Sequence, residues 1–432
     1  MRDETIGGSR ETSTPCWTRE QAAGIKRSDA TVAPIVYPPE QETDDDVHIW
    51  DTWLLRNRDG SIAEIDGYRV IFSLSASKEL LPGKRHDVAT IRYFYSEDGK
   101  TWTCGGPVFD GDAFGSRQWA GSALYDDDGT VYVYYTAAGY RDEAELSYQQ
   151  RIAVGAGGAV TTDADGLSVD GPWSHEILLE PDGEFYEREE QSRGMIYTFR
   201  DPWFFEDPAT GETCLLFEAN TPVSESDNPY DCDAVHEEFN GSVGLAVSTT
   251  GDPTDWELQE PLLESVATNQ ELERPHMIVR DGSYYLFVSS HKHTFAPGLE
   301  GHDALYGFVA DSLRGEFEPL NGSGLVATNP ASAPFQTYSW LAYPHSEELL
   351  VSSFFNYYDL RGLSLDDVAG LPPVEQQRRF GGTLAPTLRI ELDGAETRIL
   401  GALEHGHLPL KREALPRLLT EYRLSADDGG EY

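Results

Sequence analysis

Five short runs of similar composition recur along most of this chain, and they constrain its fold more than any other feature. Each run is rich in β-branched and aromatic residues and ends near small polar residues; the runs cover residues 68–74, 131–136, 213–217, 284–289 and 349–355. Their starts lie roughly 60–80 residues apart, with weaker candidate strands between them. This spacing indicates a repeating four-stranded sheet. We therefore predict an all-β fold, a five-bladed β-propeller, with a sandwich or jelly roll as the alternative.

The turns and the chain ends fit the same interpretation. Asp-Gly pairs begin at Asp59, Asp98, Asp128 and Asp281 and supply hairpin turns, and Trp102 is expected to pack over its own turn. Residues 1–30 are predicted to be a polar N-terminal tail with a short helix around residues 17–26. Residues 31–432 are predicted to be a single propeller domain.

The net charge of −43 excludes one class of partner and indicates a particular environment. A phosphate backbone requires basic surfaces, so no nucleic-acid partner is expected. Only six lysines are present, while hydrophobic residues still make up 39% of the chain. A large core combined with this charge is typical of proteins adapted to molar salt, where the screening length falls to roughly 3 Å. An acidic secreted protein is the alternative.

Neither cysteine spacing nor apolar segments indicate a metal site or a membrane anchor. The four cysteines show no metal-ligand pattern; Cys214 and Cys232 are either a disulfide or two free thiols. The N-terminal segment lacks the apolar region of a Sec signal peptide. No run of 18 apolar residues exists, so no membrane span is expected.

Two aspartates lie in settings that favour chemistry. Asp51 is flanked by Trp50 and Trp53, so it is poorly solvated unless it is paired or used in a reaction; the alternative is a turn-capping acid. Asp201 follows Arg200, which is expected to hold this carboxylate ionised; the alternative is a structural salt bridge at a strand end.

A glutamate pair completes a candidate catalytic set. Glu271 and Glu273 are expected to lie on one face of an extended segment. Like charges this close raise the pKa of one of the two carboxyl groups, as a general acid requires. The alternative is a solvated acidic edge of a sheet. Retaining glycosidases use one carboxylate as nucleophile and another as acid/base. A propeller brings residues of distant blades together at its axis, so Asp51, Asp201 and Glu273 are expected to share one site.

The segments that carry these residues resemble glycoside hydrolase family 68, the levansucrases and inulosucrases, and most closely its haloarchaeal members. The similar segments are VHIWDTWLLRNRDG (47–60), RQWAGSA (117–123), TFRDPWFFEDP (198–208), CLLFEANT (214–221), NGSVGLAV (240–247), ELERPHMIV (271–279), SHKHTFAPG (290–298), QTYSWLAYP (336–344) and FGGTLAPTLRI (380–390). They span almost the whole chain in the family's order. The resemblance implies a five-bladed propeller with a funnel-shaped, acidic axial pocket.

The resemblance also implies a role for each matching residue. Asp51 matches the nucleophile, Glu273 the acid/base and Asp201 the stabiliser of the transition state. Residues that match the lining of the sugar subsites are Trp50, Trp119, Arg200, Glu271, Arg274, His291 and Tyr338. No cofactor is implied, because the glycosidic bond of sucrose drives the transfer.

Three positions depart from what the resemblance leads us to expect. Ala120 replaces a serine that in many relatives hydrogen-bonds the nucleophile, so the partner of Asp51 is left open. His291 stands where Gram-positive members have an arginine that contacts substrate. Gln270 replaces an acidic residue of a structural calcium site, so no metal is expected.

The function expected from this resemblance is fructosyl transfer from sucrose to a fructan or fructo-oligosaccharide acceptor, with a slight preference for an inulin-type product. A mainly hydrolytic sucrase is the first alternative, and a sugar- or ion-binding propeller without turnover is the second. We expect a monomer. The substrate favours an extracellular location, whereas the lack of a Sec signal in this chain leaves the cytoplasm as the other location.

Overall fold

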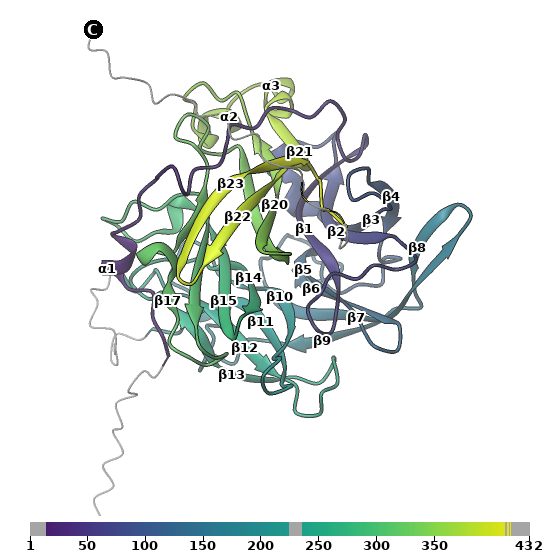
Figure 1. The fold of residues 1–432 in the computed structure, drawn as a ribbon, viewed down its shortest axis with the longest axis horizontal. Helices are drawn as coiled ribbons and strands as arrows, with labels where there is room; N and C mark the ends of the chain where they lie inside the picture. The colour runs from purple at the N-terminus through teal and green to yellow at the C-terminus, as the bar shows by residue number, and fades with distance from the viewer. Residues whose placement is uncertain (1–13, 224–235, 411–412, 414, 416–432) are drawn as a thin grey trace, which may run out of the picture.

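Five blades of consecutive strands, arranged around a common centre, form the part of the chain that the structure describes (Figure 1). The coordinates are a computed structural model, and they describe residues 14–223, 236–410, 413 and 415. The blades make up a propeller, and each begins with the strand that lies nearest the centre. The first two blades form one continuous sheet, because β1 pairs in parallel with β5 between Leu55–Asn57 and Ala123–Tyr125.

The strands follow one another through the blades in chain order. The first blade holds β1 (Val47–Asn57), β2 (Arg69–Ser77), β3 (Thr90–Ser96) and β4 (Thr103–Pro107). The second holds β5 (Arg117–Tyr125), β6 (Thr130–Ala138), β7 (Gln150–Asp163), β8 (Gly166–Asp170) and β9 (Ser174–Leu179). The third holds β10 (Phe199–Glu206), β11 (Thr213–Asn220), β12 (Gly241–Val247) and β13 (Glu257–Glu264).

The remaining blades and the short helices complete the fold. The fourth blade holds β14 (Glu273–Arg280), β15 (Ser283–Ser290), β16 (Ala304–Ala310), β17 (Glu318–Pro319) and β18 (Leu325–Thr328). The fifth holds β19 (Thr337–His345), β20 (Glu348–Tyr357), β21 (Phe380–Leu384), β22 (Pro386–Asp393) and β23 (Glu396–His405). The helices are α1 (Arg19–Ala22), α2 (Leu365–Ala369), α3 (Pro373–Arg378), η1 (Pro82–Val88), η2 (Glu189–Gln191), η3 (Lys292–Thr294) and η4 (Leu320–Gly322).

The predicted repeat is confirmed, and each of the five runs has the same place in its blade. The runs fall on β2, β6, β11, β15 and β20, the second strand of every blade. These strands are buried along nearly their whole length, because a neighbouring strand pairs on each side and neighbouring blades cover both faces. Burial on both faces explains why they are continuous apolar runs rather than alternating ones.

The innermost strand of every blade contains a β-bulge. The pairing register shifts between Trp50 and Trp53 in β1, between Trp119 and Gly121 in β5, and at the corresponding points of β10, β14 and β19. A bulge inserts extra residues on one strand and redirects their side chains. The five bulges therefore form one layer of irregular backbone around the centre of the propeller.

The ring closes between the first and fifth blades, and the N-terminal segment packs across the outside. Thr43 donates its backbone N–H to the Thr383 hydroxyl at 2.8 Å, and the His48 ring meets the Phe380 ring edge-on at 4.8 Å. Trp17 is fully buried, with its ring 5.1 Å from that of Tyr306 in the fourth blade.

Two local expectations differ from the structure. The N-terminal helix is shorter than residues 17–26: it covers only Arg19–Ala22, after a capping box at Thr18. Trp102 is not confined to its own turn: it belongs to a buried cluster with Leu403 and Leu408. Its indole N–H donates to the Gly406 carbonyl at 2.8 Å, so it fastens the strand-to-strand turn of the first blade to the segment after β23. Among the described residues, no helix is long and apolar enough to span a bilayer.

Candidate active site

The five bulges bring two consecutive residues from every blade to the centre. The first residue of each pair is Trp50, Trp119, Arg200, Glu273 or Tyr338, and the second is Asp51, Ala120, Asp201, Arg274 or Ser339. Four of the second residues, all but Ala120, have left-handed backbone, with φ between 50° and 59°. Such a conformation in a non-glycine residue stores roughly 1–3 kcal/mol, and strain of this kind gathers at functional sites.

A cavity of about 650 Å³ lies against this layer. Of the predicted site residues, Asp51, Trp119, Arg200, Asp201 and Glu273 line it directly. The other five are not part of the lining, but each contacts a residue that is; they are Trp50, Glu271, Arg274, His291 and Tyr338. The predicted axial pocket is therefore present, and it unites the three proposed catalytic carboxylates.

Arg200 connects three carboxylates rather than the one beside it in sequence. Its Nε donates to Glu218 at 2.7 Å, and its Nη2 donates to Glu271 at 2.9 Å and to Glu273 at 3.1 Å. Glu218 is opposite Arg200 in the β10–β11 ladder. Burial alone lowers the pKa of Arg200, but Glu218, Glu271 and Glu273 outweigh it and raise that pKa well above its usual value.

The expectation that Arg200 holds Asp201 ionised is met only in direction: the Arg200 charge lowers the Asp201 pKa, but burial outweighs it, and Arg200 donates its hydrogen bonds to other carboxylates. The Asp201 carboxylate accepts the backbone N–H of Arg274 at 3.1 Å. Burial raises the pKa of Asp201 to about 7; the charge of Arg200 opposes this shift, and Glu273 and Asp51 add to it. At neutral pH the cluster therefore holds protons that solvent-exposed carboxyl groups would have lost.

Asp51 has a hydroxyl partner on the fifth blade. Burial raises the pKa of Asp51, while the charge of Arg274 and a hydrogen bond with Ser339 lower it. Arg274 donates to the Ser339 hydroxyl at 2.7 Å and to the Thr52 carbonyl at 2.7 Å, so one guanidinium links the first, fourth and fifth blades. Ser339 thus supplies the contact that the residue at position 120, an alanine, cannot make.

Two rings control the surroundings of Glu273. The Tyr338 hydroxyl donates to its Oε2 in a short hydrogen bond, and Nε2 of His291 lies 3.9 Å from the same oxygen. Burial lowers the pKa of His291, but Asp303, 3.1 Å from Nδ1, and Glu273 raise it to about 9. His291 is therefore an imidazolium at neutral pH. With Arg200 on Oε1, Glu273 has donors or positive charge on both oxygens.

Aromatic rings form one wall of the cavity. His86 lies between two tryptophans, 5.4 Å from the Trp50 ring and 6.4 Å from the Trp119 ring. Its carbonyl accepts the Trp119 indole N–H at 3.0 Å. Burial lowers the pKa of His86 well below its usual value, so this ring is neutral. Flat rings beside carboxylates suit a ligand with both C–H faces and hydroxyl groups, such as a sugar.

Four further residues belong to the site and are not among those expected from the sequence: His86, Glu218, Asp303 and Ser339. A signal for Ser339 exists in the chain: the pair Tyr338-Ser339 precedes the run 349–355 by the same spacing with which Glu273-Arg274 precedes the run 284–289. Aligning these runs would have placed Ser339 in the bulge layer. The other three depend on pairing partners that spacing alone does not reveal.

No metal centre is indicated by the described residues, in which no three histidine, cysteine, aspartate or glutamate side chains are grouped to hold an ion. Gln270 donates its amide to the Ile196 carbonyl at 2.7 Å, so it serves as a neutral tether. Cys214 is a buried free thiol, whereas Cys232, the other residue of the suggested disulfide, lies outside the described part of the chain.

The chain is similar to known proteins over most of its length. Residues 8–409 match the model of glycoside hydrolase family 68, described as levansucrase/invertase. The levansucrase of Rahnella aquatilis is 35% identical over 424 residues, covering 91% of this chain and 96% of that protein. The extracellular sucrase of Zymomonas mobilis is also 35% identical, covering 91% of this chain and 94% of that protein.

Solved structures agree with the sequence matches. The inulosucrase from Halalkalicoccus jeotgali bound to kestose superposes with a TM-score of 0.92 at 68% identity, covering 94% of this chain and 100% of that one. The levansucrase from Gluconacetobacter diazotrophicus superposes with a TM-score of 0.77 at 27% identity, covering 92% and 93% respectively.

Proposed function

Because this chain belongs to the levansucrase/invertase family, glycoside hydrolase family 68, we propose that it cleaves sucrose with retention of configuration and transfers the fructosyl unit to a sugar acceptor. The observation that carries the proposal is the bulge layer, which brings Asp51, Asp201 and Glu273 from three different blades onto one cavity. Retaining transfer requires two carboxylates that act from opposite sides of one glycosidic bond.

In the first step, Asp51 attacks the anomeric carbon of the fructosyl unit. The bond from this carbon to the bridging oxygen breaks, and Glu273 gives its proton to that oxygen as glucose leaves. The Tyr338 hydroxyl and Arg200 already donate to Glu273, so the carboxylate that remains is stabilised. Asp201 contacts the fructosyl unit as positive charge develops on it.

In the second step, an acceptor hydroxyl attacks the same carbon. Glu273 removes the hydroxyl proton, the ester bond to Asp51 breaks, and both carboxyl groups return to their starting states. Every group in the cycle is a side chain of the bulge layer. Water as the acceptor gives hydrolysis instead. A mainly hydrolytic activity is therefore the alternative function for this chain, and its similarity to an extracellular sucrase is the observation that favours it.

The proposal has two further parts: the product is of the inulin type, and the protein is adapted to high salt. The 68% identity with an inulosucrase from Halalkalicoccus jeotgali supports the first. The net charge of −43 supports the second.

The test is incubation with sucrose in molar salt, with free glucose and free fructose measured over time and any polymer identified by carbon NMR. Glucose in excess of fructose is expected, and equal amounts would identify a hydrolase. Asp51→Asn should abolish glucose release while circular dichroism and the melting temperature stay near those of the parent. Turnover by that variant would overturn the assignment of the nucleophile.

A further inference from the structure

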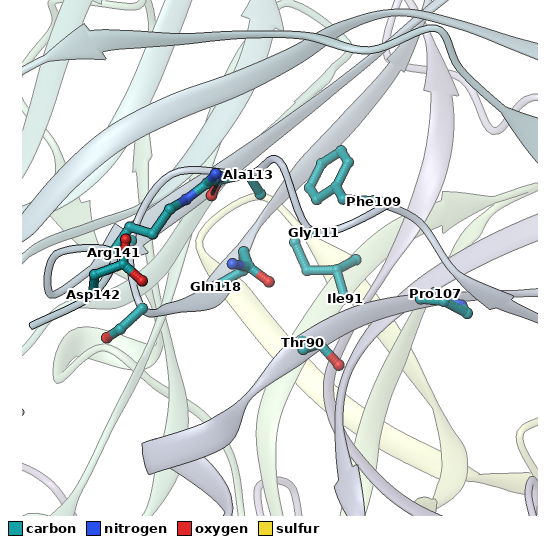
Figure 2. A pocket seen from close by; sticks show the side chains of 11 residues that line it. Thr90, Ile91, Pro107, Phe109, Gly111, Ala113, Gln118, Arg141 and Asp142 are labelled. Carbon is teal, nitrogen blue, oxygen red and sulfur yellow. Dashed lines mark hydrogen bonds between the residues drawn. The ribbon is translucent and has the colours of Figure 1, made fainter.

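A second cavity, of about 490 Å³, lies between the first and second blades, apart from the site described above (Figure 2). Its apolar wall includes Ile91, Pro107 and Phe109. Its polar residues include Gln118 and Arg141, and in the view of Figure 2 the Gln118 side chain lies between those of Arg141 and Ile91. A volume of this size falls within the range of small-ligand sites.

The two cavities share their walls. In β5, Gln118 lines the outer cavity and the next residue, Trp119, lines the catalytic one. The segment 83–91 contributes His86 to the catalytic cavity and Ile91 to the outer one. The connection 139–149 does the same, with Tyr148 on the inner side and residues 141–142 on the outer side. A chain-like ligand that leaves the catalytic cavity over Trp119 therefore has a second cavity beside it.

The shared connection 139–149 carries two exposed rings, Tyr148 at 53% and Tyr140 at 46% exposure, and Phe114, at 37%, lies between two residues that line the outer cavity. Tyr148 stands against the catalytic rim, because its ring and that of Trp119 both cover the buried guanidinium of Arg117, at 5.2 and 5.4 Å. Exposed aromatic faces beside polar groups provide stacking surfaces for a polyhydroxylated chain.

The connection that carries these rings is rigidly built. Glu143 accepts hydrogen bonds from the Ser116 hydroxyl at 2.6 Å, from Arg117 at 3.1 Å and from the Ser147 hydroxyl at 2.7 Å. Arg141 donates to the Ala113 carbonyl at 2.7 Å. These bonds fix both sides of the outer cavity, so a ligand would not have to order the connection first.

The polar groups of the outer cavity suit a neutral ligand. Among the described residues that line it, Arg141 and Asp142 are the only charged ones, and Arg141 also lies 4.0 Å from the carboxylate of Asp112, so no uncompensated charge lines the cavity. Arg141 is already engaged with the Ala113 carbonyl. The Gln118 amide, by contrast, has no hydrogen-bond partner among the described residues and offers both a donor and an acceptor.

We propose that the outer cavity and the rings of Tyr140 and Tyr148 bind the fructan chain, so that an acceptor held there stays next to the catalytic cavity between transfers. This inference rests on the proposed function. A second binding region raises affinity through effective concentration, without any new contact at the reacting sugar. The enzyme would accordingly extend bound chains in preference to starting new ones.

The test uses Asp51→Asn as the parent, so that bound chains are not consumed, and titrates it calorimetrically with inulin-type chains of increasing length. We expect affinity to increase from a trisaccharide to longer chains. Gln118→Leu, which removes the amide at nearly constant volume, and Tyr140→Ala should each weaken binding of the longer chains about tenfold and leave that of the trisaccharide unchanged. Tyr37→Ala, at a site 73% exposed elsewhere, is the matched control.

In the active enzyme, Gln118→Leu and Tyr140→Ala should release glucose from sucrose at the parent rate but give shorter products. Unchanged affinity for long chains in both variants would overturn the inference, as would a glucan of equal length that binds as tightly as the fructan. These results would leave the proposed function intact. Failure of the unmodified enzyme to release glucose would instead overturn the proposed function.

Discussion

The imidazole of His291 stacks on the ring of Tyr338, with centroids 3.8 Å apart and planes 12° from parallel. Both rings act on one atom, because the Tyr338 hydroxyl donates to Oε2 of Glu273 and the imidazolium lies 3.9 Å from it. The stack fixes the direction of the hydroxyl. It also places a positive charge beside the carboxylate proposed to exchange a proton with both sugars.

Removing the Tyr338 hydroxyl should therefore slow the reaction without disturbing the fold. Tyr338→Phe keeps the stack on His291 but removes the donor to Glu273. A hydrogen bond to a charged group is worth roughly 1.5–3 kcal/mol, so kcat/KM for sucrose should fall by about 10- to 100-fold. The measurement is the initial rate of glucose release, together with the melting temperature. Parent-level kcat/KM would contradict a role for this bond.

The charge of His291 predicts a pH dependence of stability. Its pKa is raised from 6.5 to about 9, mainly by Asp303 and then by Glu273, which outweigh burial. The folded state therefore binds this proton more tightly than the unfolded state does. The resulting stabilisation, on the order of 3 kcal/mol at most, is fully present below pH 6.5 and is lost as the pH rises through about 9.

Urea unfolding between pH 6 and pH 10 measures this effect. His291→Gln cannot take up the proton, so the difference in unfolding free energy between parent and variant should shrink as the pH rises through this range. A difference that stays constant from pH 6 to pH 10 would show that His291 is neutral in the folded protein.

Much of the fold could be predicted because the second strand of each blade is recognisable in the sequence. The bulge layer could not be predicted in this way. The second strands are buried on both faces, so they stand out as apolar runs whatever their neighbours are. The left-handed backbone of Asp51, Asp201, Arg274 and Ser339 recurs at one position of four blades, and that recurrence depends on the surrounding blades, because arginine and serine rarely adopt it by themselves. The spacing of the runs indicated the propeller without indicating its functional layer.

The expectations for Arg200 and Trp102 are incomplete for one physical reason. Arg200 was assigned to its neighbour Asp201, yet it pairs with Glu218, which lies opposite only when the register of β10 and β11 is known. Trp102 was assigned to its own turn, yet its partner Gly406 is 304 residues away in the chain. The sequence shows only which residues are neighbours along the chain, so nearby residues were chosen as interaction partners. A propeller instead places strands side by side that are distant in the chain.

The hydroxyl of Ser339 should control the ionisation of Asp51. Ser339→Gly removes the hydrogen bond that lowers the Asp51 pKa and is compatible with the backbone φ of 58°. The acid limb of the kcat/KM profile should therefore shift to higher pH. Ser339→Ala should move it equally but, because alanine carries the same Cβ as serine, should leave the backbone strain as it is in the parent.

A rescue separates this effect from a general loss of packing. Ala120 occupies the corresponding place in the second blade, so Ala120→Ser in the Ser339→Gly background offers Asp51 a new hydroxyl. The acid limb should return toward that of the parent. If Ser339→Gly leaves the pH profile unchanged, Asp51 does not depend on this hydroxyl.

The acidic surface should make stability depend on salt. Self-repulsion from a net charge of −43 weakens as the screening length falls from ~10 Å at about 0.1 M to ~3 Å at about 1 M salt. The melting temperature should therefore rise over this range by several degrees, equally in sodium and potassium chloride. Lowering the pH toward about 4 protonates surface carboxylates, so the salt dependence should weaken there. A dependence of the same size at both pH values would mean that salt acts through hydrophobic burial rather than through screening.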